Sequence, residues 1–260
     1  MLRQTLRLAL ILLTAPTARA TLLAYDGFDY PAGQDLAGQS GGFGWDGIWG
    51  NNGGAFTVVS SPGLSYPGLG SIGNAATTAP NQGATAGDSV TTYPRVASSN
   101  IYGIPGSTVY YSFLLQPDAD FGNYGGINIG GGELFIGRSG NQSTYGLEDA
   151  TTVAPGSVPV RQGVPALLVV RADFGLTGTD TFRLYSDPTL PGLEPALDDA
   201  TLTLNSTTQS NLLYLNNIGG YTTDELRIGT TYADVTAVPE PVLALFIPVL
   251  MLASRKIGRR

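Results

Sequence analysis

Apolar and polar residues alternate in short runs along the central part of the chain. Within 180–187, Phe182 and Leu184 fall on one side of an extended chain, and Arg183 and Tyr185 fall on the other. A period of two residues is typical of a β-strand with one buried face. No part of the body carries a sustained apolar stripe with a period of 3.6 residues, so we expect helices to be few and short.

The run at 166–170 is apolar at every position, which predicts a central strand covered on both faces. Glycine, proline, asparagine and aspartate separate the strand-like runs, as turns require. The stretch 50–100 is richer in small residues and predicts long loops with short edge strands. The strand-like runs are 55–59, 107–116, 126–130, 133–137, 165–174, 180–187, 200–205, 211–217 and 224–235. An all-β sandwich follows from this pattern.

The N-terminal segment, residues 1–20, has the layout of a secretory signal peptide. Two arginines precede an apolar run over 8–13, and small residues close the segment with Ala18 and Ala20 at the cleavage site. A retained membrane anchor is the alternative, but the apolar run is well below the ~20 residues that a spanning helix needs. We therefore expect export and a mature chain that begins near Thr21.

The C-terminal segment, residues 237–260, joins a Pro-Glu-Pro triplet to an apolar run over 242–253 and a basic tail. As a helix the run would rise about 18 Å, short of the ~30 Å hydrocarbon core of a bilayer. A buried core helix is the alternative on length alone. The run is apolar on every face, however, and cations follow it, which favours a short membrane segment.

This order of parts resembles the PEP-CTERM sorting signal of Gram-negative bacteria. The resemblance implies a tail held transiently in the inner membrane, an exosortase and a signal peptidase as processing partners, and delivery to the cell surface or the extracellular polysaccharide. An ordinary weak tail anchor is the alternative. The residues that carry the motif are Pro239, Glu240, Pro241, Arg255, Lys256, Arg259 and Arg260.

Composition narrows the function further. The 260 residues include 36 Gly and 17 Pro, which suits one β-rich domain over 21–236. Residues 21–238 carry 19 acidic side chains and six arginines, a net charge of −13, so nucleic acids and anionic lipids would be repelled. There is no Cys or His and no Lys before Lys256, which excludes disulfides, thiolate nucleophiles, a Ser-His-Asp relay and the usual zinc sites from the body.

The segments 22–50, 167–188 and 224–235 look like concanavalin A-like lectin/glucanase domains of the LamG type. The resemblance implies a jelly-roll β-sandwich in which the first and last strands pair, which would bring "LLAYDGFDY" beside "DELRIG". A different β-sandwich is the alternative.

A retaining glucanase of this kind would place its carboxylates in a Glu-x-Asp-x-(x)-Glu motif, about 5–5.5 Å apart. The body has four glutamates, Glu133, Glu148, Glu194 and Glu225, and none of them opens such a motif. Glu148 and the adjacent Asp149 would point to opposite faces of a strand. We therefore expect no catalytic residues and no enzymatic activity.

The resemblance also implies a structural Ca²⁺ near the paired terminal strands. Asp224 matches the acid that begins the last strand, and Asp26 or Asp29 would lie nearby. Solvated strand ends or turn caps are the alternative. Asp118 and Asp120 are a further candidate pair in a segment that also reads as an Asp-rich turn.

Trp45 and Trp49 lie in a glycine-rich segment, where an exposed indole would offer a flat surface to a sugar ring. The alternative is that both rings cap the sandwich core. We expect a non-catalytic surface or matrix protein that is a structural or carbohydrate-binding module. A carbohydrate-active enzyme with a degenerate site and a matrix protein without a specific ligand are the alternatives.

Overall fold

The computed structural model describes residues 22–50, 57–79, 92–206 and 209–237. The predicted signal peptide with its cleavage site at Ala18 and Ala20, and the sorting signal from Pro239 to Arg260, lie outside the described residues. The description below therefore concerns the body of the protein.

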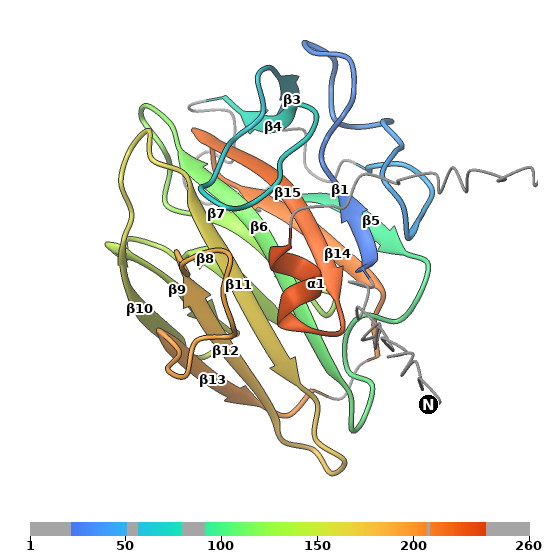
Figure 1. Cartoon of the computed structure of the whole chain (residues 1–260), viewed down its shortest axis with the longest axis vertical. Coiled ribbons are helices and arrows are strands. Elements are labelled where there is room, and N and C mark those ends of the chain that lie inside the picture. The colour runs from blue at the N-terminus through green and yellow to red at the C-terminus, as the bar shows by residue number, and fades with distance from the viewer. Residues whose placement is uncertain (1–21, 51–56, 80–91, 207–208, 238–260) are drawn as a thin grey trace, which may run out of the picture.

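Two antiparallel sheets pack face to face (Figure 1). The first has the strand order β13-β12-β11-β6-β15-β4-β3, with β1 also paired to β15, and the second has the order β10-β9-β8-β7-β14-β5-β2. The strands of the first sheet are β1 (Leu22–Asp26), β3 (Thr57–Ser60), β4 (Ala75–Thr78), β6 (Thr108–Pro117), β11 (Ala166–Asp173), β12 (Asp180–Ser186), β13 (Ala200–Leu204) and β15 (Tyr221–Gly229). Those of the second are β2 (Trp45–Asp46), β5 (Thr92–Ala97), β7 (Gly125–Ile129), β8 (Leu134–Arg138), β9 (Thr144–Glu148), β10 (Val153–Pro159) and β14 (Leu212–Asn217).

This all-β sandwich confirms the predicted fold class at the level of two packed antiparallel sheets. One expected strand is wrong in part, because 224–235 does not remain extended. β15 ends at Gly229, and the short helix α1 (Tyr232–Thr236) follows. Thr231 caps this helix, with its side chain accepting from the backbone of Asp234 while the Asp234 carboxylate accepts in return. The capping pair starts a helix where an apolar pattern alone suggested a longer strand.

β15 lies at the centre of the first sheet. β6 pairs along one edge, and the other edge is shared by β1, next to the second half of β15, and by β4, next to the first half. Ala24 of β1 lies opposite Ile228 of β15. The predicted pairing of the first and last strands is therefore confirmed.

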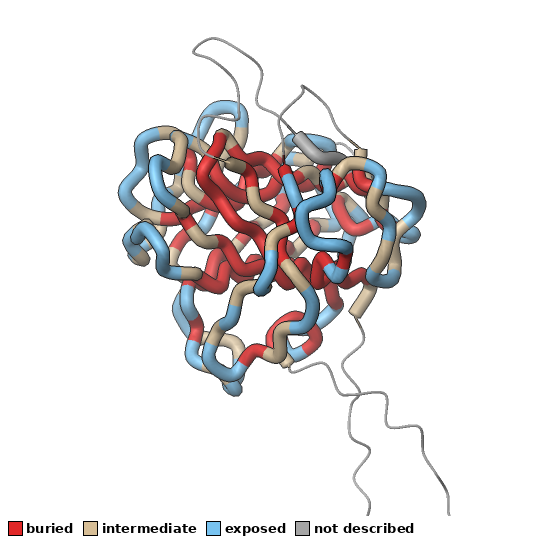
Figure 2. Tube along the Cα trace, turned by 90° about the horizontal axis from the view of Figure 1, so that it is seen from above, coloured by how far each residue is buried: buried red, intermediate tan, exposed pale blue. Residues whose placement is uncertain are grey.

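The main core fills the space between the sheets. Leu168 and Val170 of β11 point into it, whereas Leu167 and Val169 point to the outer face of the first sheet. There they join a second, smaller cluster that includes Val235 of α1. β11 is thus buried on both faces, as its unbroken apolar run predicts. Figure 2 shows the buried strands enclosed by exposed loops.

A buried ion pair interrupts the regular pairing of β15. Between Asp224 and Arg227 the register against β6 shifts, and Glu225 takes a left-handed backbone conformation with φ of 54°. Arg227 Nη2 lies 2.5 Å from Glu225 Oε2, and both side chains are fully buried. Arg227 also donates to the carbonyls of Gly70 and Ala237, and Glu225 accepts from the backbone N–H of Ile72.

We expect Arg227→Ala to lower the free energy of unfolding by about 3–5 kcal/mol, because the Glu225 carboxylate would remain buried without its partner. Urea unfolding measures this difference. Arg161→Ala is the matched control, since Arg161 is exposed and should change stability by less than about 0.5 kcal/mol. A loss below about 1 kcal/mol in Arg227→Ala would show that the pair contributes little.

Candidate functional site

The outer face of the first sheet carries a hollow of about 470 Å³. Its floor is formed by β6 and β11, one wall by the loop that follows β12, and the other wall by the turn into α1. The lining residues are Thr108, Tyr110, Arg171, Gly192, Leu193, Glu194, Thr230, Thr231, Tyr232 and Ala233.

The floor is polar because alternate positions of neighbouring strands face outward in register. Tyr110 lies opposite Arg171, and Arg171 lies opposite Arg183 on the next strand. One step along the strands, Thr108 lies opposite Asp173. Residues two apart share a face of a sheet, so these pairs form two parallel polar rows.

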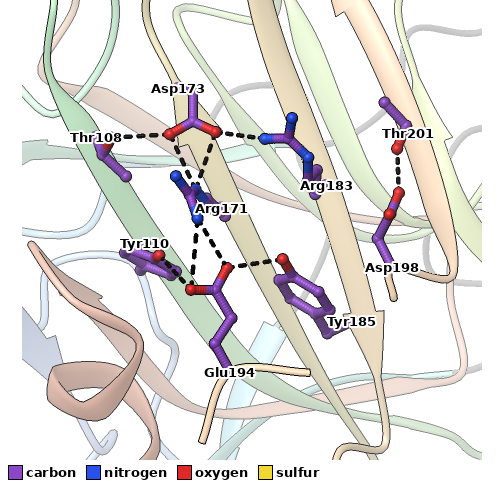
Figure 3. A network of polar contacts seen from close by, with 9 residues as sticks. All are labelled: Thr108, Tyr110, Arg171, Asp173, Arg183, Tyr185, Glu194, Asp198 and Thr201. Atoms are coloured by element: carbon purple, nitrogen blue, oxygen red, sulfur yellow. Dashed lines mark hydrogen bonds and ion pairs between the residues drawn. The ribbon is translucent and has the colours of Figure 1, made fainter. Parts of the chain in front are cut away.

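Glu194 joins the loop to this floor (Figure 3). Its carboxylate accepts hydrogen bonds from the hydroxyls of Tyr110, at 2.8 Å, and Tyr185, at 2.7 Å. Arg171 Nη1 lies 3.2 Å from Glu194 Oε1, while its Nε lies 2.9 Å from the carboxylate of Asp173. The carboxylate of Asp173 also accepts from the hydroxyl of Thr108 and pairs with Arg183. The network fixes the loop on the sheet.

The network keeps its acids ionised and its phenols protonated. Burial opposes ionisation of Glu194, but the hydrogen bonds from Tyr185 and Tyr110 and the charge of Arg171 outweigh it and lower its pKa. The pKa of Asp173 is lowered in the same way, against burial, by Thr108 and Arg171. Burial and the neighbouring Glu194 raise the pKa of both tyrosines well above 10.

Tyr232 of α1 lines the hollow and has an unsatisfied polar atom. The residue is 5% exposed, and its ring packs edge-on against Tyr110 and Tyr185, with centroid distances of 6.4 and 6.2 Å. Its hydroxyl has no hydrogen-bond partner among the described residues. Burial, followed by the charge of Glu194, raises its pKa to about 12, so the hydroxyl keeps its proton.

The structure places the two tryptophans at one end of the main core. Trp49 is fully buried, stacks on Phe28 with a centroid distance of 5.7 Å, and donates from Nε1 to Asp26. Trp45 is half-buried and donates to the carbonyl of Tyr25. Trp49 therefore offers no open ring face to a sugar.

Asp26 is committed to a buried network. Its carboxylate pairs with Arg95 and accepts from Trp49 Nε1, from the hydroxyl of Tyr30 at 2.6 Å and from the backbone of Phe28 at 2.8 Å. Arg95 lies on β5, so this pair ties the first strand of one sheet to the other sheet. The two oxygens of Asp26 are thus occupied by four donors.

Asp224 and Asp29 complete the set predicted to hold calcium, and the structure separates their roles. Asp224 is buried and accepts from the backbone N–H groups of Leu64 and Glu225, each at 2.7 Å, whereas Asp29 is exposed. Burial, followed by the charge of Glu225, raises the pKa of Asp224 to about 8. Asp224 is therefore largely protonated near neutral pH, while the buried carboxylates of Asp26 and Glu225 pair with Arg95 and Arg227.

The hydrogen bonds of Asp26 and Asp224 lend no support to the calcium site, which stays a prediction. Calcium takes six to eight oxygen ligands, and among the described residues no group of three acidic side chains is placed to hold a metal. Asp118, the other candidate, accepts from Gln116 and Thr222, and Asp120 is exposed at a turn with φ of 54°. Asp26, Asp118 and Asp224 are thus hydrogen-bond acceptors within the fold.

The sequence identified Glu194 only as one of four glutamates without a catalytic motif and did not predict the network around it. The usable signal was the polar alternation on three strands, at Thr108 and Tyr110, Arg171 and Asp173, and Arg183 and Tyr185. The other three glutamates are also hydrogen-bonded: Glu133 accepts from Ser206, Glu148 from Ser139 and Tyr124, and Glu225 from Tyr25.

Comparisons with known proteins give no family. No protein-family model and no curated protein matches the chain. Three solved structures are similar to the chain. An endo-β-1,4-glucuronan lyase from the fungus Trichoderma reesei is 14% identical, with 79% of this chain and 98% of that chain covered and a TM-score of 0.42. A carbohydrate esterase from the Shiga toxin-encoding bacteriophage phi24B is 14% identical, with 81% and 99% of the two chains covered and a TM-score of 0.37, and the exoplasmic/lumenal domain of VIP36 in a Ca²⁺/Man-bound form is 8% identical, with 72% and 84% covered and a TM-score of 0.33. None of these likenesses assigns an activity or a ligand to this chain. In the described part of the chain, no helix is long and apolar enough to cross a membrane.

We expect stability to fall between about pH 5 and pH 8, by at most about 4 kcal/mol, because of Asp224. Its folded pKa lies above its unfolded value, so its contribution is complete in acid and is lost as the carboxyl ionises. Asp224→Asn should flatten this dependence in urea unfolding, whereas Asp29→Asn should not. Added CaCl₂ should leave the midpoint unchanged. A calcium-dependent rise that Asp224→Asn abolishes would instead restore the predicted metal site.

Proposed function

We propose that the protein is an exported, non-catalytic module that binds a neutral glycan in the hollow on the outer face of the first sheet. The observation that carries the proposal is Tyr232, which lines the hollow and whose buried hydroxyl has no hydrogen-bond partner among the described residues. A buried polar group of this kind costs about 1–3 kcal/mol when it is unpaired. A bound hydroxylated ligand would supply the missing partner.

The chemistry of the lining suits a sugar. Thr230 and Thr231 are exposed at the rim, where their hydroxyls also bond Asp234, and Leu193, 92% exposed, offers an apolar surface to the C–H face of a ring. Sugar hydroxyls both donate and accept, so they match a lining of hydroxyl, carboxylate and guanidinium groups. Pockets that combine apolar surface with a few placed polar groups are the usual sites for such ligands.

The charge of the lining supports a neutral ligand. Its one guanidinium, Arg171, is balanced by its one carboxylate, Glu194. The body as a whole is acidic, with a net charge of −13 over residues 21–238, so a polyanionic glycan would be repelled over long range. A neutral polysaccharide would not be repelled by the acidic body and would need no net charge in the lining.

The ionisation states in the hollow support binding without catalysis. Glycoside hydrolysis needs one carboxyl group that stays protonated to act as the acid, with its pKa raised. Both Glu194 and Asp173 have lowered pKa values, and Tyr110 and Tyr185, with raised ones, cannot serve as bases near neutral pH. The hollow therefore lacks a matched acid and base.

Export and sorting complete the proposal. The signal peptide at 1–20 and the PEP-CTERM-like segment at 237–260 would deliver the body to the cell surface or the extracellular polysaccharide of a Gram-negative bacterium, through signal peptidase and an exosortase. The LamG-like jelly roll would serve there as a rigid scaffold.

We expect Tyr232→Phe to weaken binding to neutral oligosaccharides at least about tenfold while leaving the unfolding midpoint unchanged or slightly raised. The loss follows from removing the hydroxyl that the ligand would satisfy. A glycan array identifies the oligosaccharide, and calorimetric titration measures the affinity. Tyr124→Phe is the control, because Tyr124 bonds Glu148 outside the hollow. Equal affinity for Tyr232→Phe and the unaltered protein would remove the hollow as the site.

We also expect no release of reducing ends from a panel of neutral glucans and mannans at any pH between about 5 and 8. Product formation that Glu194→Gln abolishes would contradict the non-catalytic proposal and favour the enzyme alternative.

A further inference from the structure

A second, smaller cavity of about 110 Å³ opens where the two sheets meet at the far end of β11. Tyr145 of β9 and Pro159 of β10 line it from one sheet, and Ala166 of β11 lines it from the other. β9 and β10 lie against β12 in this region (Figure 1). Arg161, Val164 and Asp187 complete the lining together with Val158.

Tyr145 has the same unusual property as Tyr232. The residue is 1% exposed, and its hydroxyl is buried without a hydrogen-bond partner among the described residues. Buried hydroxyls are nearly always paired, so an unpaired hydroxyl on a residue that lines a cavity makes that cavity a candidate for a partner supplied from outside the protein. The cavity has room for more than one water molecule and so for the edge of one small ring.

Two opposite charges face this cavity without closing into an ion pair. Asp187 is exposed, and its Oδ1 accepts from the backbone N–H of Leu167 at 2.9 Å. Arg161 is exposed and forms no ion pair or hydrogen bond with any described side chain. The guanidinium is near enough to lower the pKa of Asp187, although burial and Asp199 raise that pKa overall.

The three polar groups select the chemistry of the ligand. An anion would meet the carboxylate of Asp187, and a cation would meet the guanidinium of Arg161. A neutral pair of adjacent hydroxyls can donate to Asp187 and accept from Arg161 while it also satisfies Tyr145. Pro159 and Val164 supply an apolar wall for the C–H groups of the same ring.

We propose that this cavity is a second sugar site, which takes one neutral ring through two adjacent hydroxyl groups. It lies five residues along β11 from Arg171, about 16 Å away at ~3.3 Å per residue, and on a different face of the sandwich. One ring cannot fill both sites. The domain is therefore bivalent and can bridge two glycan chains, an inference that rests on the proposed function of the first hollow.

Nuclear magnetic resonance titration of the full protein tests the second site directly. The probes are methyl glucoside, methyl mannoside and methyl galactoside, with methyl glucuronide and inorganic phosphate as anionic comparisons. We expect the amide signals of residues 144–146, 161–167 and 187 to shift with a neutral glycoside and not with the anions. Tyr145→Phe and Arg161→Met should each weaken this response at least about tenfold. Tyr214→Phe, which lines neither cavity, is the control.

The two proposals fail separately. If Tyr232→Phe removes shifts at 108–110, 171, 192–194 and 230–233 while those at the second site persist, the sites are independent and both proposals stand. Shifts only at the second site would contradict the proposed function of the first hollow and the bivalence, while the second site would still stand. No shift at 144–146 and 161–167 with any neutral glycoside, or a response to phosphate alone, would overturn the second site.

Discussion

The structure depends on the ion pair between Glu225 and Arg227, buried in the irregular part of its central strand. Removing two charges from water is costly unless their partners and hydrogen bonds are complete. Arg227 meets that condition by donating to the carbonyls of Gly70 and Ala237, and Glu225 does so by accepting from Ile72 and Tyr25. One pair therefore holds a long surface loop, the first strand and the end of the described chain together.

The candidate site inherits its rigidity from this pair. The carbonyl of Ala237 follows α1, and Ser112 on β6 donates to the carbonyl of Val235 in the same helix, so α1 is anchored at its C-terminal end over the sheet. Glu194 fixes the opposite wall through Tyr110 and Tyr185. With both walls fixed before any ligand arrives, binding need not order loops, which reduces its entropic cost. The network of Glu194, Arg171 and Asp173 also suits recognition better than proton transfer, because its acids stay ionised and its tyrosines stay protonated.

Sequence reasoning located most strands, because apolar alternation and turn residues report directly on sheet faces. It missed β9 and β10, and the run of β10, "VAPGSVP", contains two prolines and is largely exposed. It also extended the last strand across the turn at Thr231. It paired the first and last strands correctly but could not foresee that Asp26 would be taken up by Arg95, some 70 residues away. Hydrophobic pattern is local, whereas the partners of buried charges are set by packing across the sandwich. The hollow could not be predicted from local pattern either, because Glu194 contacts Tyr110 only after the loop folds onto the sheet.

The central claim is that the hollow binds a neutral glycan and leaves it intact. Hydrogen exchange followed by mass spectrometry, with neutral oligosaccharides in excess, tests both halves in one sample. The account predicts slower exchange at the walls of the hollow, residues 192–194 and 230–233, with oligosaccharide masses unchanged after prolonged incubation. Unchanged exchange at both walls, or shortened oligosaccharides in the same spectra, would contradict it.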